Sequence, residues 1–133
     1  MEVKNSRGDN RNTSSNITTD NIIFYESNRE RIINQLKQQH GLKLNDLIFL
    51  YHLYKEDASE IPLCRIKESI DFSLMEIHKT LTSITEKHIV GKIRSSEDER
   101  KVFITITPEQ RQKINVIIDD FKRIHKDILD TNT

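Results

Sequence analysis

The chain has 133 residues, of which 21 are Lys or Arg and 21 are Asp or Glu, so its net charge is zero. A chain of this length can bury one core, but only 35% of its residues are apolar, which suits an extended helical protein that completes its core by dimerising. A zero net charge argues against a nonspecific binder of polyanions, which normally has a basic excess. The longest apolar run is far shorter than a membrane span, and the single cysteine excludes an internal disulfide. We therefore expect a cytoplasmic protein with no membrane partner.

The N-terminal residues 1–19 are mainly Asn, Ser, Thr, Arg and Asp and contain almost nothing apolar. Such a segment cannot contribute to a core, so we predict a disordered tail over 1–19 and a folded domain over 20–133. From Asp20 onward, apolar residues recur at spacings of three and four, which predicts a first helix. Gly41 is placed to end that helix as its C-terminal cap.

Two helices that flank a short extended segment are predicted next. Asn45 is interpreted as the N-cap of a second helix that continues to Tyr54. Pro62 pushes the residue before it out of the α region, which predicts an extended segment over 61–63. A third, short helix follows over 64–70.

A fourth helix is predicted over 73–87 from a strong local signal. Ser73 and Glu76 form the S-x-x-E capping-box pattern, and Phe72 and Ile77 occupy the hydrophobic-staple positions. The fourth helix thus begins shortly after the third ends, and two helices joined by so tight a turn predict a helix-turn-helix. We expect its inner face to consist of Leu74, Ile77, Leu81 and Ile84.

After His88 the apolar period changes to about 2, which is typical of strands. One strand is predicted over 89–93 and another over 102–106, with the polar, turn-prone segment 95–99 between them. A β-hairpin directly after a recognition helix is a wing, and we place this wing at 92–104.

The last helix is predicted to begin with Thr107 as N-cap, Pro108 at the first helical position and Gln110 completing a capping box. Its apolar residues recur at steps of about seven, as in a short coiled-coil seam. Because this stripe is too long for a small domain to cover alone, we assign it, with the first helix, to a dimer interface. The predicted dimerisation residues are Ile22, Tyr25, Ile32, Ile114, Ile117, Phe121, Ile124 and Ile128.

Together these elements predict a mainly α fold with a small β-hairpin wing (α+β), a winged helix-turn-helix that is dimeric through its terminal helices. Their order resembles the MarR superfamily of winged-helix regulators. The segment 98–107, which opens with Asp-Glu-Arg, is similar to the D-x-R wing signature of that superfamily and the strand after it. The segment 92–100 more closely resembles the wing of the staphylococcal accessory regulator (SarA) family, and the similarity extends upstream to about Arg31.

This resemblance implies a homodimer that binds A·T-rich promoter DNA and controls virulence or surface-associated genes. It implies a recognition helix in the major groove and a wing arginine in or beside the minor groove. Several relatives sense oxidants with a cysteine in the first helix, whereas this chain has none between Asp20 and His40. Its one cysteine, Cys64, is interpreted as a small buried hydrophobe.

Candidate DNA contacts lie opposite the apolar stripe of the fourth helix, where Lys79 faces a phosphate or a guanine. Glu76 is interpreted as structural, because an acid is unfavourable near phosphates. In the hairpin, an arginine suits the narrow A·T minor groove, and Asp98 and Glu99 are expected to position Arg100. The predicted DNA-binding residues are Ser73, Met75, Lys79, Thr82, Ser83, Arg94, Asp98, Glu99, Arg100 and Lys101.

The sequence shows no catalytic constellation, no glycine-rich phosphate loop and no zinc-ligand spacing among its five histidines. We therefore expect no enzyme, cofactor or metal. The alternative interpretation is a winged-helix protein-interaction module with weak or no DNA binding, since residues 60–101 hold as many acidic as basic side chains. A third is a ligand-responsive repressor with a pocket between its dimerisation and DNA-binding parts, but the sequence indicates no particular small-molecule effector.

Overall fold

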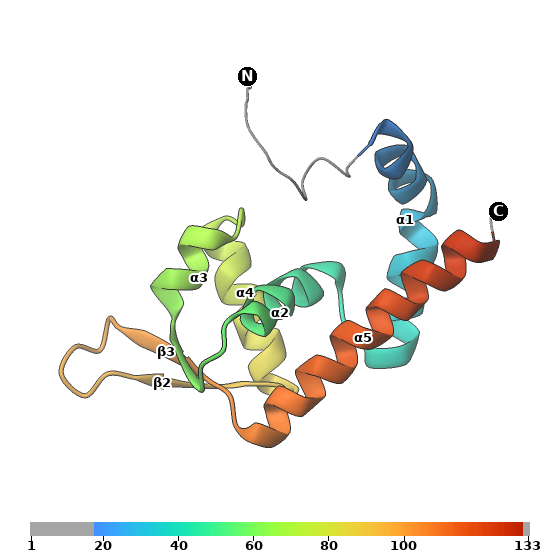
Figure 1. The fold of residues 1–133 in the computed structure, drawn as a ribbon. Helices are drawn as coiled ribbons and strands as arrows, with labels where there is room; N and C mark the ends of the chain where they lie inside the picture. The colour runs from blue at the N-terminus through green and yellow to red at the C-terminus, as the bar shows by residue number, and fades with distance from the viewer. Residues whose placement is uncertain (1–17, 132–133) are drawn as a thin grey trace.

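The computed structural model describes residues 18–131, with side chains up to residue 128. Within this part of the chain, five helices and three short strands follow one another in the predicted order (Figure 1). None of the described helices is long and apolar enough to cross a membrane. The elements are α1 (Thr19–His40), α2 (Leu44–Lys55), β1 (Glu60–Pro62), α3 (Leu63–Ser69), α4 (Leu74–Glu86), β2 (Gly91–Arg94), β3 (Val102–Thr105) and α5 (Pro108–Thr131).

The ends of α1 follow from its capping residues. The Thr18 side chain accepts a hydrogen bond from the backbone N–H of Asn21 at 3.2 Å, so the helix begins at the end of the predicted tail. Residues 1–17, where most of that tail was predicted, lie outside the described residues. Gly41 ends the helix as predicted, in the left-handed conformation with φ 66°, which glycine adopts without steric cost.

The predicted N-cap of α2 is wrong. Asn45 lies inside the helix, whose N-cap is Lys43. The carboxylate of Asp46 accepts a hydrogen bond from the Lys43 backbone N–H at 3.1 Å, which satisfies a donor that the start of a helix otherwise leaves free. A side chain three residues into the helix thus does the capping that we expected from the residue at its start.

The three strands form one antiparallel sheet in the order β1-β3-β2. The strand predicted over 89–93 begins only at Gly91, because Ile89 and Val90 are buried in the turn after α4. Gly91 pairs with Thr105, and a Cβ at this glycine would lie 2.5 Å from the threonine Oγ1. A larger residue at position 91 would therefore force the Thr105 side chain to move.

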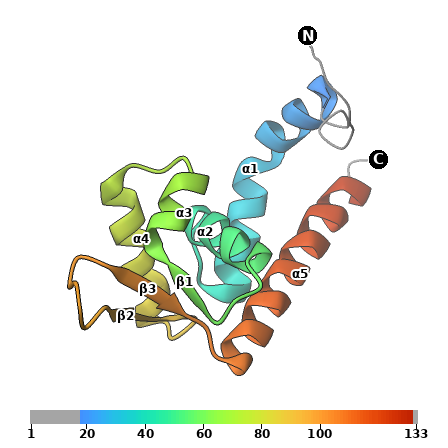
Figure 2. The same cartoon turned by 60° about the vertical axis from the view of Figure 1, so that its left-hand side comes forward.

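The core joins the helices and the sheet into one unit. Its main cluster contains fully buried residues of α2, β1, α4 and β3, and the first half of α5 packs against them. A second, smaller cluster lies between α1 and α5 where these two helices extend away from the rest of the chain (Figure 2). It consists of Ile32, Ile124 and Ile128, with Phe24, Tyr25 and Phe121 packed against it.

The premise that α5 presents an uncovered apolar stripe is wrong. α1 and α2 of the same chain pack along α5 and cover the stripe, so most of the predicted dimerisation residues are already buried. The buried ones are Ile32, Ile114, Ile117, Ile124 and Ile128. Large apolar side chains that are exposed near the same helices are instead Ile22, Ile23 and Val116.

One polar side chain fastens α5 to the domain. The Arg111 guanidinium donates hydrogen bonds to the backbone carbonyl oxygens of Leu53 at 3.0 Å and Ala58 at 2.8 Å. These carbonyl groups lie at the end of α2 and in the loop after it. At the start of α5, the Thr107 backbone N–H donates to the Gln110 side-chain oxygen at 2.9 Å, and the Gln110 backbone N–H donates to the Thr107 hydroxyl at 3.1 Å. These two bonds confirm the predicted capping box.

Candidate nucleic-acid interface

The α4 helix is the centre of the candidate interface. Ser73 caps it as predicted, because its hydroxyl accepts a hydrogen bond from the Glu76 backbone N–H at 3.1 Å. Three members of the predicted inner face are buried, namely Ile77, Leu81 and Ile84. Leu74 was predicted with them but is 60% exposed, since Phe72 packs against the core at this end of the helix and Thr80 occupies the remaining buried position.

One face of α4 brings together three of the five DNA contacts that were predicted for this helix and its cap. Met75, Lys79 and Thr82 are exposed, and their spacing of three and four residues places them side by side on the helix. Met75 is the most open of them at 79% exposure. His78 is exposed on the flank of the same face, and the sequence analysis did not select it.

Ser83 does not join this face. It is half-buried, and its hydroxyl donates a hydrogen bond to the buried Asp46 carboxylate at 3.2 Å and accepts one from Lys87 Nζ at 2.8 Å. Asp46 on α2 thus turns Ser83 toward the body of the domain. The sequence could not show this pairing, because Ser83 and Asp46 are 37 residues apart.

Glu76 was expected to act structurally through the capping box with Ser73, whereas its carboxylate contacts Asn45 and Thr80. Hydrogen bonds from the side chains of Asn45 and Thr80 lower the pKa of its carboxyl below the usual range. The bond from the Thr80 hydroxyl measures 3.0 Å and gives that buried hydroxyl a partner. The Glu76 charge is therefore committed to contacts within the protein.

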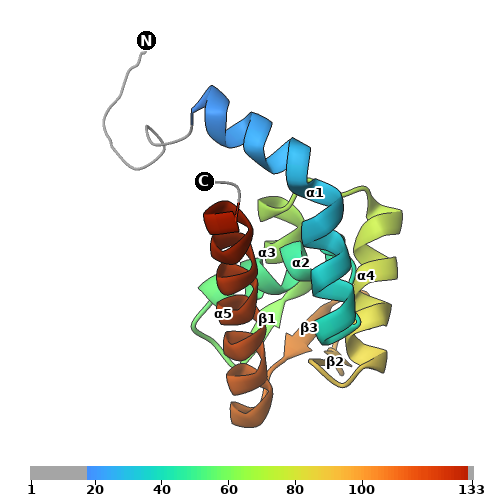
Figure 3. The same cartoon turned by 90° about the vertical axis from the view of Figure 1, so that its right-hand side faces the viewer.

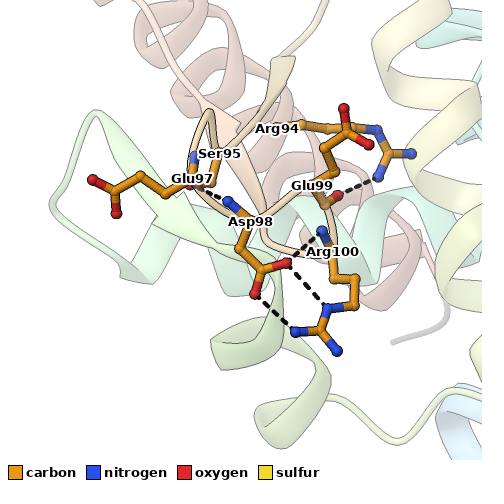
Figure 4. A network of polar contacts seen from close by, with 6 residues as sticks. All are labelled: Arg94, Ser95, Glu97, Asp98, Glu99 and Arg100. Atoms are coloured by element: carbon orange, nitrogen blue, oxygen red, sulfur yellow. Dashed lines mark hydrogen bonds and ion pairs between the residues drawn. The ribbon is translucent and has the colours of Figure 1, made fainter.

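The tip of the wing is organised around Asp98 (Figure 4). Its carboxylate accepts hydrogen bonds from the Arg100 backbone N–H at 3.0 Å and from Nε of the same guanidinium at 3.1 Å. These bonds from Arg100 lower the pKa of the Asp98 carboxyl. The Arg100 side chain is nevertheless 92% exposed, so it is oriented without being covered.

The other wing residues hold the hairpin together through the backbone. Ser95 Oγ accepts hydrogen bonds from the backbone N–H groups of Glu97 and Asp98 at 3.2 and 3.3 Å. The Arg94 guanidinium donates to the backbone carbonyl of Glu99 at 2.9 Å. Asp98 contacts Arg100 as expected. Glu99 was expected to position Arg100 as well, but its backbone carbonyl accepts a hydrogen bond from Arg94 instead.

A groove of about 620 Å³ lies between α3, α4 and the wing. We call it the wing groove, and its five basic residues are Lys67, Lys92, Arg94, Arg100 and Lys101. None of the described residues that line it is acidic. Lys92 was missed by the sequence analysis although it lies two residues from Arg94 on one strand, a spacing that places both on one face. No sequence pattern indicated Lys67, because only the packing of α3 against the wing places it in the wing groove.

Cys64 also lines the wing groove, and its side chain is exposed. The interpretation as a buried hydrophobe is therefore wrong. Leu63 and Ile66 take the buried positions of α3, and Cys64 lies on the helix face between them that points outward. Among the described residues, no three His, Cys, Asp or Glu side chains come close enough to hold a metal ion.

A capped helix behind a tight turn, a three-stranded sheet and a basic hairpin define a winged helix-turn-helix protein. Residues 31–117, well over half of the chain, match the family described as "Transcriptional regulator SarA/Rot". The chain belongs to this family of transcriptional regulators, which confirms the resemblance to the SarA family.

Similar proteins agree with this assignment. The chain is 33% identical over 95 residues to the HTH-type transcriptional regulator SarU of Staphylococcus aureus; the match covers 71% of this chain and 38% of SarU. Among solved structures, the MarR family regulator AbsC of Streptomyces coelicolor has a TM-score of 0.60 at 15% identity, covering 88% of this chain and 83% of AbsC. The MepR–DNA complex of S. aureus has a TM-score of 0.64 at 13% identity, covering 86% and 85%. These structures confirm the MarR-type winged-helix fold.

Proposed function

We propose that the protein regulates transcription by binding promoter DNA, with α4 in the major groove and the wing at the minor groove. The observation that carries this proposal is the wing groove, where five basic side chains and no described acidic one flank the exposed face of α4. DNA presents a phosphate charge about every 1.7 Å along its axis, so such a surface attracts it. MepR, which has the same fold, was solved with DNA.

A preference for A·T-rich DNA is part of the proposal. Arg100 is almost fully exposed at the tip of the wing, and Asp98 fixes its guanidinium. A·T-rich tracts have a narrow minor groove with a strongly negative potential, which favours an inserted arginine. Membership of the SarA/Rot family supports virulence or surface-associated genes as the targets.

We also propose that the protein acts as a homodimer through the projecting parts of α1 and α5. The start of α1 and the end of α5 extend away from the winged-helix unit (Figure 2). Ile22 and Ile23 are 55% and 58% exposed on this part of α1. Adjacent exposed isoleucines on a projecting helix favour a second copy of the chain as their cover.

The alternative, a protein-interaction module, rested on the balanced charge of the chain. That balance is not uniform over the surface, because five basic residues and, among the described residues, no acidic one line the wing groove beside α4. Fluorescence anisotropy with a labelled A·T-rich duplex and a G·C-rich control, each at several salt concentrations, tests the two readings. We expect salt-sensitive binding that favours the A·T-rich duplex, and no binding even at low salt would support the interaction module.

The wing contact has its own variant. If Arg100 contacts one phosphate in each subunit of a dimer, Arg100→Ala makes the slope of log affinity against log salt shallower by about 1.8 units. Arg65→Ala is the matched control, because Arg65 is an exposed arginine of α3 that pairs with Glu56. Equal slopes for the two variants would remove Arg100 from the mechanism.

The orienting role of Asp98 is separable from its charge. Asp98→Ala and Glu97→Ala each remove one negative charge from the wing, but only Asp98 holds Arg100. We expect Asp98→Ala to weaken DNA binding and Glu97→Ala to leave it unchanged or strengthen it. Stronger binding by both variants would show that Asp98 acts only through its charge.

A further inference from the structure

A second basic hollow lies on the opposite flank of α4. Its volume is about 470 Å³, and it is enclosed by the second half of α1, the start of α2 and α4. Figure 3 shows the second half of α1 beside α4, with the wing below them. We call it the helix hollow, and its five basic residues are Arg29, Lys37, Lys43, Lys79 and Lys87.

The turn between α1 and α2 builds this hollow. Gly41, with φ 66°, reverses the chain just after α1 and brings Lys43 back toward Lys37. α4 supplies the opposite wall with Lys79 and Lys87. All five basic side chains are exposed, so their ammonium and guanidinium groups are available to a partner in solvent.

The two acidic residues of the helix hollow are already engaged. Asp46 is buried and accepts hydrogen bonds from the Ser83 hydroxyl and the Lys43 backbone N–H. Glu76 accepts from Thr80 and Asn45. Counting both carboxylates, five basic against two acidic side chains leave three net positive charges on this surface.

The position of the helix hollow indicates its partner. A helix with its side chains is about 10–12 Å across, and the major groove is about 12 Å wide. A helix that fills this groove has a phosphate backbone along each flank. If the wing groove faces one backbone, the helix hollow faces the other.

We propose that the helix hollow binds the phosphates of the second DNA strand, so that α4 is clamped from both sides. This inference rests on the proposed function and adds contacts from α1 and α2, outside the recognition helix and the wing. These contacts are not specific for sequence, but they fix the depth and angle of α4 in the groove. Lys37 and Lys43 are thereby assigned to DNA binding.

The test removes two positive charges from the helix hollow and compares the salt dependence of DNA binding with that of a variant that loses two positive charges elsewhere. Lys37→Gln/Lys43→Gln is the test variant, and Lys113→Gln/Lys126→Gln, on exposed positions of α5, is the control. We expect the salt slope of the test variant to be shallower by about 1.8 units per subunit, at about 0.9 for each lost phosphate contact. The control should keep the slope of the unmodified protein.

Neutral methylphosphonate linkages, placed one at a time along each strand, then locate the contacts. Within each half-site, the unmodified protein should lose affinity at positions on both strands, and the test variant should become insensitive on one of these two strands. Thermal unfolding checks that the variant is folded, and Arg29→Gln/Lys37→Gln is a second pair if it is not.

The outcomes separate the two proposals. If the unmodified protein binds DNA but the test variant matches its control, the helix hollow is not a phosphate site while the proposed function stands. Benzoate binding to the hollow, measured by calorimetry, together with unchanged DNA affinity of the variant, would also overturn the inference and indicate a small-anion site. If the unmodified protein binds no DNA, the proposed function itself is wrong.

Discussion

Met75 is the most exposed of the large apolar residues that the structure describes. It is 79% exposed in the first turn of α4, beside Leu74 at 60%. Two exposed apolar side chains at the start of α4 have an unfavourable free energy of hydration, which a binding partner that covers them would remove. In the major groove, the apolar group they can meet is the C5-methyl of thymine.

We therefore predict that Met75 contacts thymine methyl groups. Replacing thymine by uracil removes only the methyl, and at about 0.8 kcal/mol per buried methyl this weakens binding about fourfold for each contacted base. Met75→Ala should bind both duplexes weakly and lose most of the difference between them. Val116→Ala is the control, because Val116 is an exposed apolar residue of α5. An unmodified protein that binds both duplexes equally would contradict the contact.

Among the elements, α5 has the role that differs most from expectation. It was predicted to form a dimer interface with the first helix because its apolar stripe was expected to be uncovered, but α1 and α2 of its own chain cover that stripe. The dimer interface itself stays a prediction. Arg111 fixes its first turns to the end of α2 through two backbone carbonyl groups. The helix whose last turns project from the winged-helix unit is thus anchored to that unit at its other end.

Arg111→Met should lower the free energy of unfolding by about 2 to 3 kcal/mol, because two partly buried carbonyl groups lose a charged donor. Urea denaturation measures the change. Arg123→Met serves as the control, since Arg123 is a more exposed arginine of α5 that pairs only with Asp120 three residues away in the described contacts. We expect that loss to stay below about 0.5 kcal/mol. Similar losses in both variants would show that Arg111 contributes no more than a surface pair.

At the scale of the whole molecule, the zero net charge conceals two basic surfaces. Ten of the 21 basic residues line the wing groove or the helix hollow, with only Asp46 and Glu76 as acidic company. Most of the acidic side chains therefore lie outside the linings of these two surfaces, and the zero net charge of the chain does not describe the charge beside α4.

The dimer proposal makes opposite predictions for exposed and buried isoleucines. Ile22→Asp/Ile23→Asp should yield a folded monomer, measured by sedimentation velocity, because both side chains are exposed in the single chain. Ile117→Ala should instead destabilise the chain by about 2 to 5 kcal/mol, since Ile117 is 1% exposed within it. A dimer that survives the double substitution would place the interface elsewhere.

The order of the helices and strands, and the wing among them, could be predicted from the sequence. Local signals were sufficient there: the Ser73 and Thr107 hydroxyls each accept a hydrogen bond from the backbone N–H three residues further on, and Gly41 ends α1 in the left-handed conformation. The order of helices and hairpin then followed, because apolar spacing records which face of each element is buried.

The tertiary structure alone decided which side chains share a surface. Ser83 turns inward because Asp46, distant in sequence, accepts its hydrogen bond, and Cys64 opens into the wing groove because Leu63 and Ile66 fill the core positions beside it. The apolar stripe of α5 is covered because α1, from the other end of the chain, packs against it. Burial and charge clustering depend on contacts between distant segments, and periodicity within one segment carries no record of them.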